Sequence, residues 1–121
     1  METPVPQIDS TLVTTRTLIK NLPTTPDGSA VTVGGFVETV RDQKKVQFII
    51  LRDETGSVQL VNPALREDDP EAASSPERRE LTDTISALTG GTFVIIEGTL
   101  KLDGRVKLGG LEVKIGSLTP L

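Results

Sequence analysis

Cysteine, histidine, tryptophan and tyrosine are all absent from this chain of 121 residues. Without thiols or imidazoles it can form no disulfide, no thiolate or imidazole metal site, and no Ser-His or Cys-His nucleophile pair. No apolar run approaches the roughly 20 residues that a membrane-spanning helix needs, and no signal-peptide pattern opens the sequence. These absences favour a soluble, cytoplasmic protein of one domain that uses no metal or other cofactor.

Basic charge is scarce, because 13 lysines and arginines stand against 17 acidic residues. The net charge of −4 argues at first against a nucleic-acid partner. Residues 66–83, however, hold seven acidic and three basic side chains, so this segment carries the whole excess. The only lysine pair, Lys44-Lys45, lies between Arg41 and Arg52. A modest basic footprint is therefore present in the first half of the chain.

The apolar patterns predict five strands and one helix. The strands are expected over residues 30–42, 46–52, 57–62, 92–102 and 106–118, with Gly34-Gly35 marking a bulge or barrel corner in the first. Ser75-Pro76 is typical of a helix start, and Leu81, Ile85 and Leu88 form an apolar stripe on a helix over residues 76–88. We expect that stripe to be buried against the strands.

A helix between the third and fourth of five strands is the element order of the OB-fold, a Greek-key barrel that binds oligonucleotides or oligosaccharides. The sequence thus predicts an all-β, five-stranded OB-fold barrel over residues 16–121. Residues 1–15 are expected to form a flexible tail. Residues 16–22 show a short apolar-polar alternation, and residues 23–29 have the composition of a loop.

The predicted hairpin at residues 48–61 carries the most informative side chains. Val58 and Leu60 share one face of its second strand, so Gln59 points to the opposite face. Both faces of its first strand are apolar, which leaves two positions open for Phe48. It either packs in the barrel interior or lies on the outer face beside Gln59.

The ordered motifs of the chain resemble the anticodon-binding domain of aspartyl-tRNA synthetases; asparaginyl-tRNA synthetases are similar, and lysyl enzymes more distantly so. The central pattern, Phe-x-x-x-Arg-Asp-x-x-Gly-x-Val-Gln, is formed by Phe48, Arg52, Asp53, Gly56, Val58 and Gln59. Further matches in order are residues 33–37, Arg41-Asp42, residues 94–98, residues 110–113 and Ser117-Leu118.

The resemblance implies a role for three side chains. Phe48 would stack on the central anticodon base, and such stacking is worth ~1–3 kcal/mol. Gln59 would hydrogen-bond that base, and Glu112 would contact the anticodon. As alternatives, Gln59 is an ordinary solvated side chain and Glu112 pairs with a nearby lysine.

Basic side chains are candidates for phosphate contact, or else simply a solvated surface. These are Arg41, Lys44, Lys45, Arg52, Lys101, Arg105 and Lys107. Arg52 and Asp53 could instead pair with each other to fix the turn. Two departures from the family stand out: Gln43-Lys44-Lys45 replaces a usually glycine-rich turn, and Phe36 replaces a common tryptophan.

No class II synthetase catalytic motif is found in the sequence, so the resemblance implies binding without catalysis. The expected partner is a tRNA or single-stranded nucleic acid, and the chain is either a domain of a larger synthetase or a free-standing paralogue. The alternative is an OB-fold that has lost RNA binding and serves as a protein-interaction module. Generic binding of single-stranded DNA is disfavoured, because such grooves offer several stacking platforms and a clear basic track.

Overall fold

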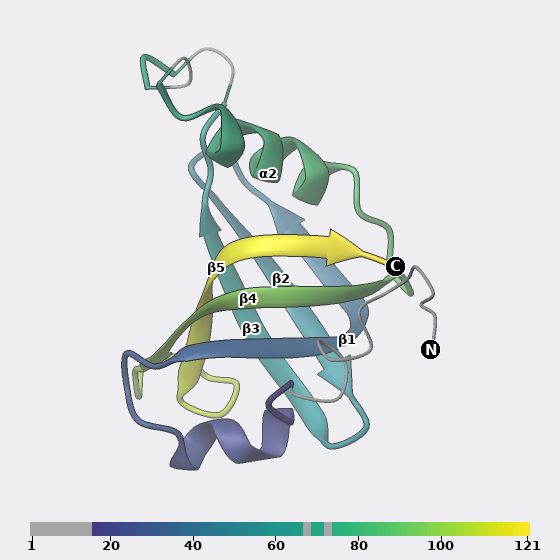
Figure 1. The fold of residues 1–121 in the computed structure, drawn as a ribbon, viewed down its shortest axis with the longest axis vertical. Helices are drawn as coiled ribbons and strands as arrows, with labels where there is room; N and C mark the ends of the chain where they lie inside the picture. Colours follow the sequence, from purple (N-terminus) through teal and green to yellow (C-terminus); the bar gives the residue numbers. More distant parts are fainter. Residues whose placement is uncertain (1–15, 67–68, 72–73) are drawn as a thin grey trace, which may run out of the picture.

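The computed structural model describes residues 16–66, 69–71 and 74–121, so the tail expected at residues 1–15 lies outside the described residues. Five strands close into a barrel in the order β1-β2-β3-β5-β4 (Figure 1). They are β1 (Ala30–Asp42), β2 (Val46–Asp53), β3 (Gly56–Pro63), β4 (Phe93–Leu102) and β5 (Leu111–Pro120). Helix α2 (Pro76–Ser86) falls between β3 and β4, which confirms the predicted OB-fold. None of the helices within the described ranges is long and apolar enough to cross a membrane.

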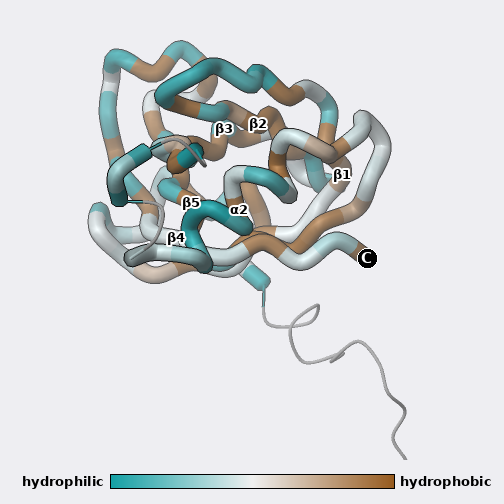
Figure 2. Tube along the Cα trace, turned by 90° about the horizontal axis from the view of Figure 1, so that it is seen from above, coloured by the Kyte–Doolittle hydropathy of each residue, from teal (hydrophilic) through white to brown (hydrophobic). Residues whose placement is uncertain are grey.

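Parallel pairing of β3 with β5 closes the barrel, whereas every other neighbouring pair is antiparallel. The interior is filled by valine, leucine and isoleucine. Its fully buried members include Val33, Ile49, Leu60, Ile96 and Val113. Buried and less buried residues alternate along β2 and β3, as the period of two of a strand requires, and Figure 2 shows brown, hydrophobic stretches in these strands as seen from the α2 end. All three phenylalanines of the chain are at least partly exposed, so no aromatic ring belongs to the buried core.

Helical segments lie at the two ends of the barrel (Figure 1). At one end α2 inserts Ile85, which is fully buried, and Leu81 and Leu88 pack against the core while partly buried. The predicted apolar stripe is therefore confirmed, although the helix ends two residues earlier than expected, at Ser86. Pro76 is its first residue, as predicted, but the Ser75 side chain makes no capping hydrogen bond.

At the opposite end lies a 3-10 helix, η1 (Ile19–Thr24), that the sequence analysis did not predict. Ile19 and Leu22 are buried in the core cluster. The loop expected over residues 23–29 is confirmed from Thr25 to Ser29, but its first two residues belong to this helix, which two buried side chains anchor to the barrel. Such tertiary anchoring leaves no local periodicity to read.

The glycine pair in β1 marks the corner of the barrel. β1 pairs with β4 up to Phe36 and with β2 from Phe36 onward. A Cβ at Gly35 would lie 2.3 Å from the carbonyl oxygen of Arg52, so the close crossing requires glycine. The register shift of β1 against β2 lies between Val37 and Thr39, not at the glycines themselves.

β5 begins later than the strand predicted over residues 106–118. Residues 103–110 form turns, and β5 begins only at Leu111. Gly109 and Gly110 have φ angles of 77° and 70°, a left-handed backbone that ends any extended run. The connection between β4 and β5 is thus longer than the three residues, 103–105, that the sequence analysis left between the two predicted strands.

Candidate nucleic-acid interface

Phe48 lies on the outer surface of the barrel. In β2 the side chains of Gln47, Ile49 and Leu51 are buried, whereas Phe48 and Ile50 are only partly buried. The alternation places Phe48 and Ile50 on the outer face. The barrel-interior position that the sequence left open for Phe48 is therefore excluded.

A groove of about 300 Å³ is lined by Thr39, Arg41, Phe48, Ile50 and Gln59. Strand register explains this grouping, since Arg41 is opposite Phe48 and Thr39 is opposite Ile50 across the β1–β2 ladder. Ile50 is in turn opposite Gln59 across the β2–β3 ladder. Three neighbouring strands thus present an aromatic ring, a primary amide and a guanidinium to one concave surface.

Gln59 and Glu112 meet across the parallel β3–β5 ladder, where they are register partners. Gln59 Nε2 donates a hydrogen bond of 3.2 Å to Glu112 Oε1. Glu112 is also opposite Lys101 in the β4–β5 ladder, but among the described residues its hydrogen bond goes to Gln59. Both side chains are partly exposed, because Val58, Leu60, Leu111 and Val113 occupy the inner positions around them. The structure therefore brings Phe48, Gln59 and Glu112 onto one continuous outer face.

Two more outward side chains join this face without having been singled out from the sequence. Thr39 lines the groove, and exposed Lys114 is opposite Val61 of β3. Lys114 follows Glu112 by two residues, so strand periodicity places it on the same face from the sequence alone, although it was not among the candidate site residues. Thr39 follows the register shift in β1, which breaks the alternation by which it could have been found.

Arg52 lies on the outer surface next to a carboxylate other than Asp53. Its Nη1 is 3.3 Å from Glu38 Oε2, and 65% of the Arg52 side chain is exposed. Glu38 also accepts a hydrogen bond from the Ser57 hydroxyl at 3.3 Å. The alternative in which Arg52 pairs with Asp53 to fix the turn is wrong, because adjacent residues of a strand point to opposite faces. Arg52 remains available at the surface but has a carboxylate beside it.

Asp53 fixes the β2–β3 turn by itself. Its Oδ1 accepts hydrogen bonds from the Thr55 amide at 2.7 Å, the Thr55 hydroxyl at 2.7 Å and the Gly56 amide at 3.1 Å. Its Oδ2 accepts one from the Ile19 amide at 2.9 Å and is 3.7 Å from Arg16 Nη1. Burial alone would raise the pKa of Asp53, but the hydrogen bonds to its charged form outweigh that effect and lower it.

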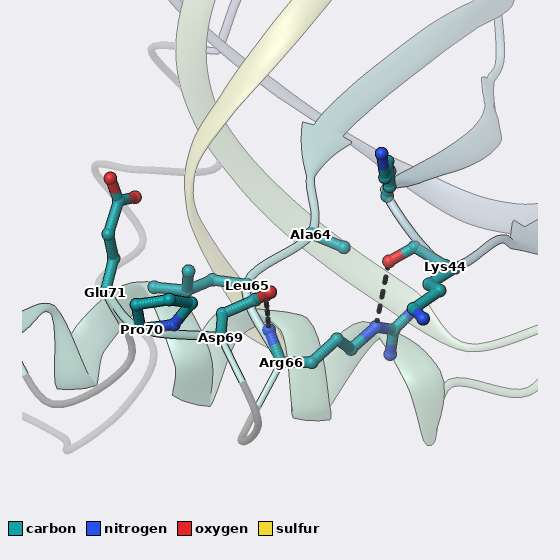
Figure 3. Close-up of a pocket in the computed structure, with 8 residues that line it drawn as sticks. Lys44, Ala64, Leu65, Arg66, Asp69, Pro70 and Glu71 are labelled. Atoms are coloured by element: carbon teal, nitrogen blue, oxygen red, sulfur yellow. Dashed lines mark hydrogen bonds between the residues drawn. The ribbon is translucent and has the colours of Figure 1, made fainter.

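The two lysines Lys44 and Lys45 lie in the β1–β2 turn, beyond the Arg41–Phe48 pair, and both are exposed. Beside them is a cavity of about 420 Å³ that Lys44, Lys45, Leu65, Arg66 and Asp69 help to line (Figure 3). Arg66 carries no sequence signal of its own, since it comes from an irregular connection between β3 and α2. In Figure 3 the Arg66 side chain extends beneath Lys44 and donates a hydrogen bond to the Lys44 carbonyl.

The remaining basic candidates lie elsewhere on the barrel. Lys101 is on β4, beyond Glu112, and exposed Lys107 lies in the β4–β5 connection. Arg105 donates to Asp103 at 2.9 Å and 3.0 Å, and this contact lowers the pKa of Asp103 to about 2. Arg41 is therefore the cation directly opposite Phe48, with Lys44 and Lys45 in the turn beyond it, whereas Lys107 and Arg105 belong to a different loop.

Comparison with known proteins identifies the family of this barrel. The family described as OB-fold nucleic acid binding domain, of the tRNA anticodon type, matches residues 31–121. The aspartate–tRNA(Asp/Asn) ligase of Methanopyrus kandleri is 33% identical over 87 residues, which cover 72% of this chain and 18% of the ligase. The asparagine–tRNA ligase of Symbiobacterium thermophilum is 33% identical over 92 residues, covering 76% of this chain and 18% of that protein.

Solved structures give the same result. The asparaginyl-tRNA synthetase of Pyrococcus horikoshii superposes with a TM-score of 0.70 at 28% identity, covering 88% of this chain and 23% of the synthetase. The chain thus spans about a fifth of the length of the ligases that it matches, and the matched part is the anticodon-binding barrel.

Proposed function

The chain belongs to the family of OB-fold nucleic acid binding domains, and we propose that it binds the anticodon loop of a tRNA, or a similar single-stranded loop, without performing chemistry. The partner is an aspartate- or asparagine-accepting tRNA. Aminoacylation requires a catalytic domain that these 121 residues do not contain. In the setting of a larger ligase, this chain would supply the contact with the anticodon.

The observation that carries the proposal is the shared outer face of Phe48, Gln59 and Glu112. An unpaired base stacks on any aromatic ring that offers its face to solvent. Phe48 is a partly exposed ring within a groove whose other lining includes the apolar Ile50 and the cation Arg41. A base on Phe48 would be desolvated between these side chains while its phosphate remains near Arg41.

The hydrogen bond between Gln59 and Glu112 gives the amide a defined orientation. A carboxylate only accepts, so the NH2 group of Gln59 faces Glu112 and its carbonyl oxygen faces away. Uridine offers one N–H donor flanked by two carbonyl acceptors on its Watson–Crick edge. The outward carbonyl of Gln59 can accept a hydrogen bond from the N–H group of uridine. The N–H of Gln59 that does not face Glu112 can donate to an adjacent carbonyl of the base. We therefore assign uridine as the preferred base on Phe48.

Charge on the β1–β2 hairpin supplies affinity that does not depend on sequence. Arg41, Lys44 and Lys45 are exposed beside the groove. Contacts of cations to phosphate position a nucleic acid but do not distinguish bases. The acidic excess falls on residues 66–83 and not on the strands of the groove. The negative charge is therefore separated along the chain from the cations that would contact phosphate.

The proposal is tested by fluorescence anisotropy with labelled anticodon stem-loops whose central base is varied. The stem-loop with uridine should bind most tightly. Phe48→Ala should cost ~1–3 kcal/mol of binding, a roughly 5- to 150-fold loss, because one stacked base is lost. Gln59→Ala should chiefly erase the preference for uridine, whereas Lys44→Ala should weaken every stem-loop alike and reduce the salt dependence. Phe93→Ala, a truncation of the same size away from the groove, serves as the control.

A protein-interaction module is the second candidate, and one observation favours it. Phe36 is 54% exposed and packs edge-on against Phe93 with ring centroids 5.0 Å apart. Exposed apolar patches often mark protein contacts. Absence of RNA binding at low salt, or unchanged affinity in a folded Phe48→Ala variant, would decide for this candidate.

A further inference from the structure

Arg66, in the connection between β3 and α2, holds the β1–β2 turn through side-chain hydrogen bonds. Its Nη2 donates to the Gln43 carbonyl at 2.6 Å and to Asp42 Oδ1 at 2.7 Å. Its Nε donates to the Lys44 carbonyl at 3.3 Å (Figure 3). One planar guanidinium thus contacts three successive residues of the turn, a geometry that only the rigid fork of arginine allows.

The connection that carries Arg66 is itself anchored next to the turn. The Arg66 amide donates to Asp69 Oδ2 at 2.7 Å, and the preceding Leu65 amide donates to the Thr82 hydroxyl of α2 at 2.9 Å. Ala64 N donates to the Lys45 carbonyl at 3.0 Å. The segment of residues 64–66 is therefore fixed both to the helix and to the lysine turn.

A buried polar network extends this anchoring into the barrel. Gln47 is fully buried, and its Nε2 donates to Asp42 Oδ1 at 3.1 Å, to the Thr82 carbonyl at 3.0 Å and to the Ser86 hydroxyl at 3.1 Å. The same Ser86 hydroxyl accepts from Arg66 Nη1 at 3.2 Å. Asp42 and Ser86 are thus shared between Gln47 and Arg66, which links α2, β2 and the turn into one unit.

The turn is closed by one backbone hydrogen bond, from the Gln43 amide to the Val46 carbonyl at 3.1 Å, and its composition adds no further restriction of the backbone. Gln43, Lys44 and Lys45 are all exposed, and none of them is glycine or proline. Two long, exposed lysine side chains lose conformational entropy when they bind phosphate. A backbone that is already fixed reduces that loss, because only the side chains remain to be ordered.

We propose that Arg66 is a positioning residue for RNA binding, which holds the backbone of Lys44 and Lys45 so that their ammonium groups meet the phosphates flanking the base on Phe48. This inference rests on the proposed function and adds the residue that prepares the phosphate contact. Arg66 acts through its hydrogen bonds to the turn, and not as a further positive charge on the RNA.

Arg66→Lys separates these two roles, because it keeps the charge and removes the fork. We expect it to weaken binding of a uridine stem-loop by roughly three- to tenfold, the loss of one or two phosphate contacts, with the preference for uridine unchanged. The salt dependence of stem-loop binding by Arg66→Lys should fall to that of the Lys44→Ala, Lys45→Ala double variant. Adding Arg66→Lys to that double variant should cost little more. Arg78→Lys is the matched control, since Arg78 donates from the same region to the Pro63 carbonyl at 2.9 Å but does not contact the turn.

The outcomes are distinct. Wild-type affinity and salt dependence in Arg66→Lys would overturn the inference alone, provided that Phe48→Ala still weakens binding. Full additivity with the lysine double variant would overturn it as well. If the unmutated protein binds no stem-loop, the inference fails together with the proposed function. Should Arg66→Lys fail to fold, Ser86→Ala removes one acceptor of the guanidinium and should reproduce a smaller loss of the same kind; no loss there would count against the inference.

Discussion

Replacing Asp53 with asparagine tests whether one buried carboxylate holds the turn between β2 and β3. The side chain of Asp53 is completely buried and accepts four hydrogen bonds. In Asp53→Asn the amide oxygen can still serve Thr55 and Gly56, but the new NH2 group faces the Ile19 amide and Arg16, which are also donors. The Ile19 amide would then be buried without an acceptor, at a cost of about 1–3 kcal/mol.

Loss of the charge adds to this cost. A hydrogen bond to a charged acceptor contributes about 1.5–3 kcal/mol, against about 0.5–1.5 kcal/mol for a neutral one, and three bonds on Oδ1 are weakened. Because these bonds share one atom they are not additive, and we expect a total loss of about 3 kcal/mol in the free energy of unfolding. Urea denaturation near neutral pH measures it directly. The control is Glu54→Gln, whose carboxylate is 61% exposed in its pair with Arg16, so solvent screening should leave the stability of this variant close to that of wild type.

The pH dependence gives a second measurement of the same variant. The pKa of Asp53 in the folded protein lies below its ordinary value of 3.8. Its stabilisation is therefore fully present above the unfolded pKa and is lost as pH falls through the folded one. The stability difference between wild type and Asp53→Asn should shrink below about pH 4. Asp53 does not hold this turn if Asp53→Asn is as stable as Glu54→Gln at neutral pH. The same conclusion follows if the stability difference between wild type and Asp53→Asn does not change with acid.

Two further predictions concern the barrel corner and the absence of catalysis. Gly35→Ala should destabilise the fold by about 1–3 kcal/mol or more, because its Cβ would lie 2.3 Å from the Arg52 carbonyl. Gly104→Ala, which has no atom within 4 Å of its Cβ, should stay within about 0.5 kcal/mol of wild type in the same urea titration, and equal effects would contradict the close crossing. ATP–pyrophosphate exchange with aspartate or asparagine should stay at the level of a buffer blank in protein free of host synthetase, and any activity above it would overturn the view that the chain only binds.

The fold could be predicted from the sequence because its determinants are local. β1 was predicted with its observed bounds, and the helix was found from the spacing of Leu81, Ile85 and Leu88. The start of β5 was missed because the valine and leucine at residues 106 and 108 resemble strand residues, whereas two left-handed glycines determine the backbone.

The candidate site was only partly accessible from the sequence. Periodicity could not place Phe48, because both faces of β2 are apolar over residues 46–51 and the one polar residue of that stretch, Gln47, points inward. A buried glutamine is stable there through hydrogen-bond partners on α2, β1 and β3, which no local pattern reveals. The role of Arg66 was missed for the same reason, since its guanidinium contacts residues 20 or more positions away.

On the proposed function, the outer face of β2, β3 and β5 is the nucleic-acid interface. Mapping of backbone amide chemical shifts during titration with a uridine anticodon stem-loop tests it most directly. We predict that the largest changes fall at Phe48, Gln59 and Glu112 and extend to the Lys44–Lys45 turn, with α2 and the Phe36–Phe93 pair little affected. Changes that concentrate around Phe36 and Phe93, or no changes at all, would contradict the claim.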